Sequence, residues 1–192
     1  MVVRLTQIDV ASETLAAVLR GEPAACEQLY HALAPALFGL IRRLIGATPV
    51  AEDLFQDTML IIYQRLSEFR GEAPLGAWAR QIAVSKCLMY LRSPWHRARL
   101  DFAFGAEEEP AWLCSAALPA PSATAVDLER ALASLSPTAR AVVWLYEVEG
   151  YSHLEIAHLF GRTVSFSKSQ LARAHERLRA WLEPQAEGVP CP

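Results

Sequence analysis

Five residues near the end of the chain have the types and the spacing that contacts with DNA bases require. Gln170, Arg173 and Arg177 recur at intervals of three and four and would share one face of a helix, with Lys168 and Ser169 in its first turn. Gln can pair with adenine and Arg with guanine through two hydrogen bonds, and each such pair contributes about 1–3 kcal/mol of base discrimination. We interpret this face as a surface that reads duplex DNA in the major groove.

The simplest alternative for this face is an ordinary surface helix with solvated Arg side chains, and its surroundings count against that alternative. The apolar pattern from Tyr151 to Phe160 is helical and ends at Gly161, which predicts a helix, a turn and a second helix. The segment Arg162–Arg179 holds five cations and one anion, a local charge of +4, whereas the whole chain has a net charge of −3. The chain therefore lacks the field that non-specific coating of nucleic acid needs, and its positive charge is local.

The turn before the second helix leaves the base preference open. Ser165 is predicted to cap this helix, which would place free backbone N–H groups near a phosphate. Phe166 has three interpretations: contact with a thymine methyl group, packing in the core, or contact with a protein partner. We prefer the packing interpretation and leave the other two open.

A second stretch combines an apolar face with an acidic and amide stripe. Thr48 is a predicted N-cap and Pro49 a first helical residue, and the helix is expected to run to about Phe69. Its predicted core face is formed by Phe55, Met59, Ile62 and Leu66, and its outward stripe by Asp53, Gln56, Asp57, Leu60 and Gln64. Such a stripe would suit a basic protein partner. Alternatively, Glu52, Asp53 and Asp57 only complement the positive end of the helix dipole.

The elements that must hold these two faces all read as helices. In the first part of the chain, Ser12 is predicted to cap a short helix through Arg20, a second helix spans Pro23–Ile45 with a kink at Pro35, and a largely buried helix runs from about Pro74 to Arg92. The apolar residues of the second of these helices recur at three and four: Cys26, Leu29, Leu33, Leu37, Leu40 and Leu44. No part of this block reads as a strand.

A second helical block begins near Asp127. Ser136 and Pro137 are predicted as N-cap and first residue of a helix over Thr138–Glu147, which Glu149–Gly150 breaks. Trp144 and Tyr146 are predicted as core or interdomain contacts. The last helix should pack on Ile156 and on the helix beginning at Thr138 through its apolar stripe, Leu171, Ala174, Leu178 and Leu182.

The stretch between the two blocks shows no sustained helical or strand period and is rich in Pro. We therefore predict an all-α protein of two small helical domains, 1–93 and 127–183, joined by an irregular linker, 94–126, with a tail at 184–192. The helix-turn-helix lies in the second domain. Aromatic residues indicate that parts of the linker dock on other surfaces: Trp95, Phe102, Phe104 and Trp112.

Combinations of residues that would serve catalysis, a metal or a cofactor are missing from the sequence. The cysteines Cys26, Cys87, Cys114 and Cys191 are far apart and are expected to be reduced thiols. The histidines form no ligand cluster at metal spacing: His31, His96, His153, His158 and His175. No Gly-rich phosphate loop or nucleophile elbow is present. We expect a protein that is not an enzyme and that holds no metal and no cofactor.

The sequence also predicts a cytoplasmic protein without membrane insertion. No apolar run has the length of a transmembrane helix. The start Met1–Arg4 lacks the features of a secretory signal, because Asp9, Ser12 and Glu13 interrupt the apolar pattern that follows.

Several motifs follow one another in a characteristic order. They are Ala51–Thr58 (AEDLFQDT), Phe69–Trp78 (FRGEAPLGAW), Ile82–Ala83, Leu135–Pro137 with Arg140, Glu149–Ser152 (EGYS) and Lys168–Ser169. Together they resemble the bacterial RNA polymerase sigma factors of the extracytoplasmic-function group. The resemblance covers nearly the whole chain, and its specificity comes from the ordered combination rather than from any one motif.

The resemblance implies three binding surfaces and two main partners, core RNA polymerase and promoter DNA. The clamp coiled coil of core polymerase would bind Glu52, Asp53, Gln56 and Asp57, and the melted −10 strand would bind Phe69, Arg70, Gly71, Trp78 and Arg80. The duplex −35 element would bind Lys168, Ser169, Gln170, Arg173 and Arg177. The linker, with acidic Glu107–Glu109, would thread through the polymerase. An anti-sigma protein, which holds many relatives inactive, is a further candidate partner.

The chain departs from the family pattern at a few positions. Ser85 stands where the family commonly has Asn, Met89 where it commonly has Asp, and Ser165–Phe166 where Gly-Thr is usual. The first two bear on promoter melting rather than on polymerase binding, and the third bears on base preference.

The leading hypothesis is therefore a sigma factor that directs core polymerase to promoters by recognising −10 and −35 elements. The alternative is a helix-turn-helix regulator that binds operator DNA without polymerase and uses its first block for dimerisation or sensing. The motif around Glu52 discriminates between them, because a plain regulator has no reason to carry it.

Overall fold

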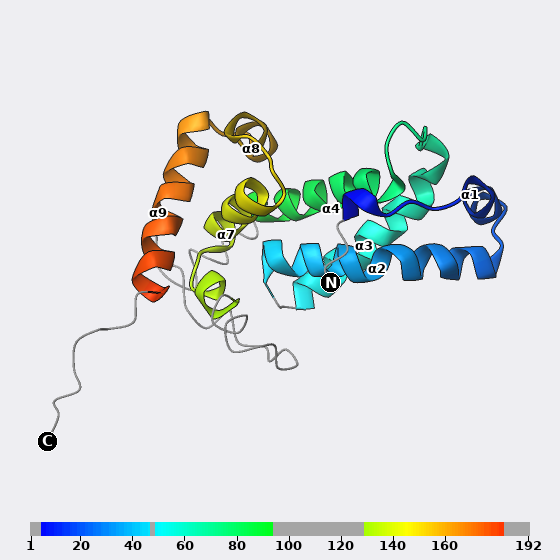
Figure 1. The fold of residues 1–192 in the computed structure, drawn as a ribbon, viewed down its shortest axis with the longest axis horizontal. Coiled ribbons are helices and arrows are strands. Elements are labelled where there is room, and N and C mark those ends of the chain that lie inside the picture. The colour runs from blue at the N-terminus through cyan, green and yellow to red at the C-terminus, as the bar shows by residue number, and fades with distance from the viewer. Residues whose placement is uncertain (1–4, 47–48, 94–128, 183–192) are drawn as a thin grey trace, which may run out of the picture. The chain divides into compact units, whose positions relative to one another are not determined.

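The computed structural model describes residues 5–46, 49–93 and 129–182, and all regular structure within these ranges is helical (Figure 1). The chain divides into two compact units, Met1–Ser93 and Pro94–Pro192, and each is described by itself. The predicted all-α class is confirmed. Thr48, the linker over 94–126 with its aromatic and acidic residues, and the tail over 184–192 lie outside the described residues.

The first unit is a bundle in which three long helices pack against one another. Its elements are η1 (Leu5–Gln7), α1 (Ser12–Leu19), α2 (Pro23–Ile45), α3 (Pro49–Arg65), η2 (Leu66–Glu68) and α4 (Leu75–Arg92). Helix α2 packs against α3 and α4, these two pack against each other, and α1 covers α2 (Figure 1). Because the three helices pack on one another, each of them can bury its apolar stripe against the other two.

Helix α2 spans the predicted residues Pro23–Ile45 and continues through Pro35. It starts with Pro23 at a position where the missing N–H has no intrahelical partner, and it ends at Gly46, whose φ of 99° suits glycine. Of the predicted apolar stripe, Cys26 is half-buried and the others are buried: Leu29, Leu33, Leu37, Leu40 and Leu44. This stripe of α2 forms part of the core of the first unit.

Two predicted helix boundaries in the first unit are wrong. Ser12 is the first residue of α1 rather than its cap, because Ala11 has the extended N-cap conformation and no side chain caps this end. Helix α3 ends at Arg65 instead of running to Phe69, and the tighter turn η2 follows. The Arg65 guanidinium and the Glu68 carboxylate pair across this junction at 2.6 Å. The tighter turn still directs Leu66 into the core.

In the second unit the described elements are a helical turn at 129–133, α7 (Pro137–Val143), the π-helical turn η4 (Trp144–Val148), α8 (His153–Phe160) and α9 (Val164–Leu182). Ser136 caps α7 as predicted, since its hydroxyl accepts a hydrogen bond from the Ala139 N–H at 3.0 Å, and Pro137 is the first helical residue. Helix α9 packs on α7 and α8, which confirms the predicted partners of its apolar stripe.

The chain is helical over the whole predicted range Thr138–Glu147, but its last part is the wider π-helical turn η4. This wider turn leaves Leu145 fully buried and Tyr146 at the surface, so Tyr146 is not a core contact of the described unit, and the interdomain alternative stays a prediction. Instead, Tyr146 stacks on the His153 ring, with centroids 4.4 Å apart. Trp144 is half-buried and donates its indole N–H to the Glu149 carboxylate at 3.2 Å.

Cys26 and Cys87 are both free thiols. Burial in the first unit raises the pKa of the Cys87 thiol to about 12, so this side chain stays neutral and unreactive at physiological pH. Within the described residues, every helix is too short or too polar to cross a lipid bilayer.

Candidate nucleic-acid interface

Helix α8 is closed at both ends by local interactions. The Ser152 hydroxyl accepts a hydrogen bond from the Glu155 N–H at 3.2 Å, and the Glu155 carboxylate accepts one from the Ser152 N–H at 2.8 Å. This reciprocal capping box was missed in the sequence, although the S-x-x-E spacing signals it. At the other end, Gly161 has left-handed angles of φ 61° and ψ 39° and turns the chain towards α9.

Helix α9 is capped by Thr163, so the predicted cap at Ser165 is wrong. The Phe166 N–H donates to the Thr163 hydroxyl at 3.2 Å, and Ser165 lies inside the first turn, where its carbonyl accepts a hydrogen bond from the Ser169 hydroxyl at 2.6 Å. The helix begins at Val164, and a cap must precede the first helical residue.

The DNA-reading face predicted on α9 lies towards solvent. Lys168, Ser169, Arg173 and Arg177 are exposed and Gln170 is half-buried. The Arg173 Nε donates to the Ser169 carbonyl at 3.3 Å, so the guanidinium lies along its own helix. On the side that faces the core, Leu171 and Ala174 are buried and Leu178 is half-buried, whereas the Leu182 side chain is outside the described set. The helix thus has separate core and polar faces.

Phe166 packs against the preceding helix. Its ring centroid is 5.7 Å from that of Phe160, and the Arg162 guanidinium carbon lies 5.9 Å from the Phe166 centroid. The ring therefore packs on α8 but is half-buried rather than enclosed in the core, and contact with a thymine methyl group or with a protein partner stays a prediction. This contact holds the turn of the helix-turn-helix against α8.

The acidic and amide stripe of α3 lies at the surface of the first unit. Glu52, Asp53, Gln56, Asp57, Leu60 and Gln64 are all exposed. Of the predicted core face, Met59, Ile62 and Leu66 are buried, whereas Phe55 is half-buried and meets the Phe38 ring edge-on at 5.4 Å between centroids. The sequence did not predict that Lys86 of α4 lies 3.0 Å from the Asp57 carboxylate.

The loop between η2 and α4 carries an aromatic pair. Phe69 packs on Trp78 with centroids 5.6 Å apart and ring planes at 50°. Around this pair is a pocket of about 260 Å³ lined by Glu68, Phe69, Arg70, Glu72, Ala73, Ala77, Trp78 and Gln81. Gly71 has a φ of 70°, which permits the sharp turn at the tip of the loop.

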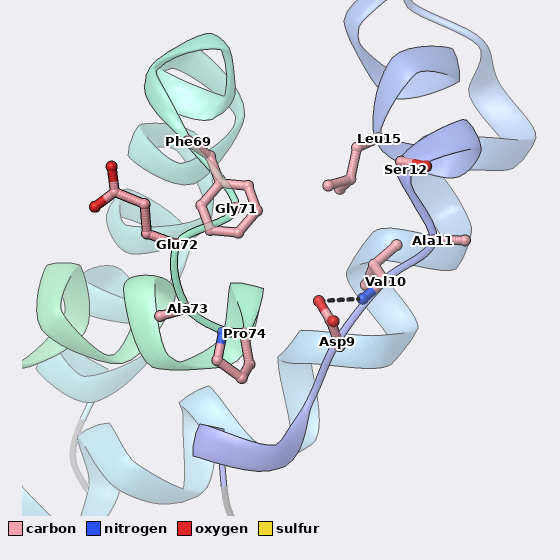
Figure 2. Close-up of a pocket in the computed structure, with 10 residues that line it drawn as sticks. All are labelled: Asp9, Val10, Ala11, Ser12, Leu15, Phe69, Gly71, Glu72, Ala73 and Pro74. Carbon is pink, nitrogen blue, oxygen red and sulfur yellow. Dashed lines mark hydrogen bonds between the residues drawn. The ribbon is translucent and has the colours of Figure 1, made fainter.

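A second, larger cleft opens on the other side of the same loop. Its volume is about 640 Å³, and it lies between the N-terminal segment and the loop. Its lining residues, shown in Figure 2, are Asp9, Val10, Ala11, Ser12, Leu15, Phe69, Gly71, Glu72, Ala73 and Pro74. Phe69 lines both cavities, so this one ring forms part of the wall of each.

The structure brings together some of the predicted −10 residues and separates others. Phe69, Arg70 and Trp78 line the smaller pocket and Gly71 the larger cleft, whereas Arg80 is half-buried on α4 and lines neither. Gln81 was missed, although it follows Trp78 at a helical interval of three. Ser85 and Met89 are exposed on the same helix, Met89 to 61%.

No group of His, Cys, Asp and Glu side chains within the described ranges could hold a metal ion. The histidines of the second unit make other contacts: His153 Nδ1 is 3.0 Å from the Ser167 hydroxyl, and His175 Nε2 is 3.1 Å from the Glu147 carboxylate. Both contacts join α9 to the preceding part of the unit.

Comparison with known proteins places family regions on both units. Residues 29–97 match the model of Sigma-70 region 2, and residues 125–178 match that of Sigma-70, region 4. A sigma factor from Bartonella quintana, RpoE, solved in complex with the anti-sigma factor NepR, shares the fold with a TM-score of 0.52 at 24% identity, over 83% of this chain and 97% of that one.

Two curated relatives match over most of their length. The ECF RNA polymerase sigma factor SigM of Mycobacterium tuberculosis is 30% identical over 180 residues, which cover 93% of this chain and 87% of SigM. The RNA polymerase sigma factor CarQ of Myxococcus xanthus is 31% identical over 166 residues, which cover 84% of this chain and 91% of CarQ. The chain belongs to the extracytoplasmic-function family of RNA polymerase sigma factors, the proteins that recognise promoters for core polymerase.

Proposed function

We propose that three surfaces of this sigma factor divide the work of initiation. The outward stripe of α3 binds core polymerase, the aromatic pocket at the start of α4 captures an unstacked base of the −10 element, and α9 reads the −35 duplex. The observation that carries this proposal is the pocket formed around Phe69 and Trp78, because a ring pair beside polar groups suits a base rather than a folded protein surface. The protein acts without catalysing a reaction, in the cytoplasm.

The charge and exposure of the α3 stripe support binding of core polymerase there. Glu52, Asp53 and Asp57 are exposed acids on one helix, and Leu60, which is 56% exposed, adds an apolar contact among them. Removing an apolar side chain of this size from water is favourable, so a partner with cations around an apolar site would fit. The helix-dipole explanation covers only the first turn, whereas the stripe continues to Gln64.

Replacing Asp53 and Asp57 together by Ala should weaken binding to core polymerase about tenfold, because α3 loses two of the negative charges that would face cations of the polymerase. The affinity can be measured with labelled protein and purified core enzyme. Binding of an isolated −35 duplex should be unchanged in the same variant.

The ion pair between Asp57 and Lys86 requires a separate control. If the pair only holds α3 against α4, Lys86→Ala should reproduce the loss of core binding. If Asp57 contacts polymerase, Lys86→Ala should leave core binding intact or raise it. Glu13→Ala removes an exposed acid elsewhere in the unit and should have no effect. A loss with Glu13→Ala would indicate a general charge effect.

The pocket around Phe69 and Trp78 has the parts that hold an unstacked base. The two rings provide a stacking surface, and Glu68, Glu72 and Gln81 provide polar groups at its edge. Arg70 is exposed and lies 3.9 Å from the Glu72 carboxylate, so it can turn towards a phosphate at little cost. Unstacking a base costs a few kcal/mol, which stacking on aromatic side chains offsets.

Arg173→Ala should weaken binding of the −35 duplex about 5- to 150-fold, which corresponds to roughly 1–3 kcal/mol for one base contact. Arg173 lies at the middle of the exposed face of α9, and its hydrogen bond to Ser169 is long enough to be exchanged easily for a base contact. The affinity can be measured by fluorescence anisotropy with a duplex selected from a random library.

Arg179→Ala is the matched control for charge, because Arg179 is an exposed cation on the same helix outside the predicted face. Its loss should have a small effect that is the same for all sequences. Equal losses for both variants on specific and random duplexes would contradict base reading by Arg173.

Run-off transcription with purified core polymerase tests the proposal as a whole. Added protein should produce promoter-specific transcripts from a pool of candidate promoters. A protein that binds duplex DNA but neither core enzyme nor the pool promoters would instead be the operator-binding regulator. Because a sigma factor of the same fold was solved with an anti-sigma factor, we extend the proposal to a protein of that kind as regulator, which would suppress these transcripts when added.

A further inference from the structure

The N-terminal segment Leu5–Asp9 is hydrogen-bonded to the first turn of α4. The Gly76 N–H donates to the Ile8 carbonyl at 2.9 Å, and the Leu75 N–H makes a longer contact of 3.5 Å with the Asp9 carboxylate. These N–H groups belong to the helix end that has no intrahelical acceptors, and Pro74, the N-cap residue, supplies no side-chain cap. A distant part of the chain therefore provides the missing cap.

The contact requires glycine at position 76 because there is no room for a side chain, and not because of the φ angle. A Cβ atom at Gly76 would lie 2.0 Å from the Leu5 carbonyl oxygen and 2.9 Å from the Ile8 Cβ. The nearer of these atoms belongs to the backbone, so no side-chain rotation could relieve the clash. Leu5 is itself buried, only 8% exposed, which holds η1 in place on α4.

The contact lies directly beside the loop that carries the aromatic pair. Helix α4 begins at Leu75, the residue after Pro74, and the loop leads into it from Phe69. Figure 2 shows the larger cleft between two segments of chain. The Asp9 carboxylate lies on the N-terminal segment, and Phe69 and Pro74 lie on the opposite wall. Movement of the N-terminal segment would therefore release the end of the loop.

We propose that Leu5–Asp9 is a clamp that positions the loop Phe69–Pro74, the −10 capture loop. Gly76 and Asp9 are its positioning residues. The inference rests on the proposed role of the loop and adds the means by which the loop is held ready. A loop ordered before binding loses less conformational freedom when it captures a base, so capture is faster and tighter. The clamp itself touches no DNA.

The test is promoter opening by the complete holoenzyme, followed with 2-aminopurine placed at single −10 positions. Gly76→Ala should slow opening about tenfold or more, since small displacements of a positioned group have large kinetic effects. Gly39→Ala is its matched control, because the added Cβ meets only the flexible Arg43 side chain at 3.1 Å. This control should open promoters at the parental rate. Binding of the −35 duplex should be unchanged in both.

Two variants of Asp9 distinguish a positioning role from an effect of charge. Asp9→Ala removes a negative charge near a DNA-binding loop, which by electrostatics alone would strengthen DNA binding. The clamp predicts slower opening instead, by about two- to tenfold, because Asp9→Ala removes the oxygen that accepts from the Leu75 N–H at 3.5 Å and from the Val10 N–H at 3.0 Å. Asp9→Asn also removes the charge but keeps an acceptor oxygen, so it should restore most of the rate. Glu13→Ala, an exposed acid on α1, should not slow opening.

The outcomes distinguish the clamp from the role of the loop. If Trp78→Ala slows opening whereas Gly76→Ala and Asp9→Ala do not, the clamp is wrong and the loop assignment stands. If Trp78→Ala has no effect, the loop assignment fails first. Faster opening by both Asp9→Ala and Asp9→Asn would show a charge effect and overturn the clamp. Circular dichroism identifies any Gly76→Ala protein that is unfolded, and the Asp9 pair then decides the question.

Discussion

Ile156→Ala should unfold the helix-turn-helix unit and abolish binding of the −35 duplex. Ile156 is fully buried on α8, which packs on α9 in a small unit whose described residues are 129–182. Removing a buried Ile side chain to Ala costs about 2–5 kcal/mol, because apolar contacts are lost and a cavity remains. A core of this size rarely supplies more than about 3–5 kcal/mol of net stability. The loss is therefore comparable with the whole stability of the unit.

Urea unfolding followed by circular dichroism, together with duplex binding, measures this effect. Leu154→Ala is the matched control, since Leu154 lies on the same helix but is 70% exposed. Its replacement should change stability by no more than about 0.5 kcal/mol. An Ile156→Ala protein with parental unfolding and parental duplex affinity would contradict the described packing of α8 on α9.

Trp78→Ala should reduce promoter opening about 5- to 150-fold and leave binding of core polymerase and of the −35 duplex unchanged. Stacking of one base on an aromatic side chain contributes about 1–3 kcal/mol, which corresponds to that range. Trp78 also supports Phe69, whose ring lies 5.6 Å away, so the variant loses part of a second stacking surface. Opening rates with a 2-aminopurine promoter give the measurement.

Trp78→Phe should recover much of the rate, because it keeps an aromatic face in the pocket. Trp181→Ala is the control for loss of a Trp elsewhere, since Trp181 is exposed on α9 outside the pocket. Equal rates for Trp78→Ala and the parent would mean that the pocket does not hold the base. A simultaneous loss of core binding would point to misfolding of the first unit.

Local signals in the sequence were sufficient for most helices. The start of α2 at Pro23 and the start of α7 at Ser136–Pro137 were predicted correctly, because an N-terminal proline and a capping hydroxyl act on groups a few residues away. The errors at Ser12 and Ser165 have the same origin. Several Ser and Thr residues stand near each helix start, and only the backbone conformation decides which of them precedes the first helical residue.

The exposed faces were also predictable, whereas their immediate partners were not. The α3 stripe and the α9 face follow from a helical period that is present in the residues themselves. The Lys86 ammonium beside Asp57 joins residues that are 29 positions apart, and the contact of Asp9 with Leu75 spans 66. No period or motif relates such residues before the helices are packed.

Residue types at short, fixed spacings were enough to predict the family, the helical class and the two exposed polar faces, on α3 and α9. Tertiary structure alone decided that Phe69, Trp78 and Gln81 share a pocket, that Arg80 lies outside it, and that the N-terminal segment caps α4. The physical reason is that a pocket and a close approach at Gly76 arise from the packing of separate segments, and packing is set by the volumes of many side chains together.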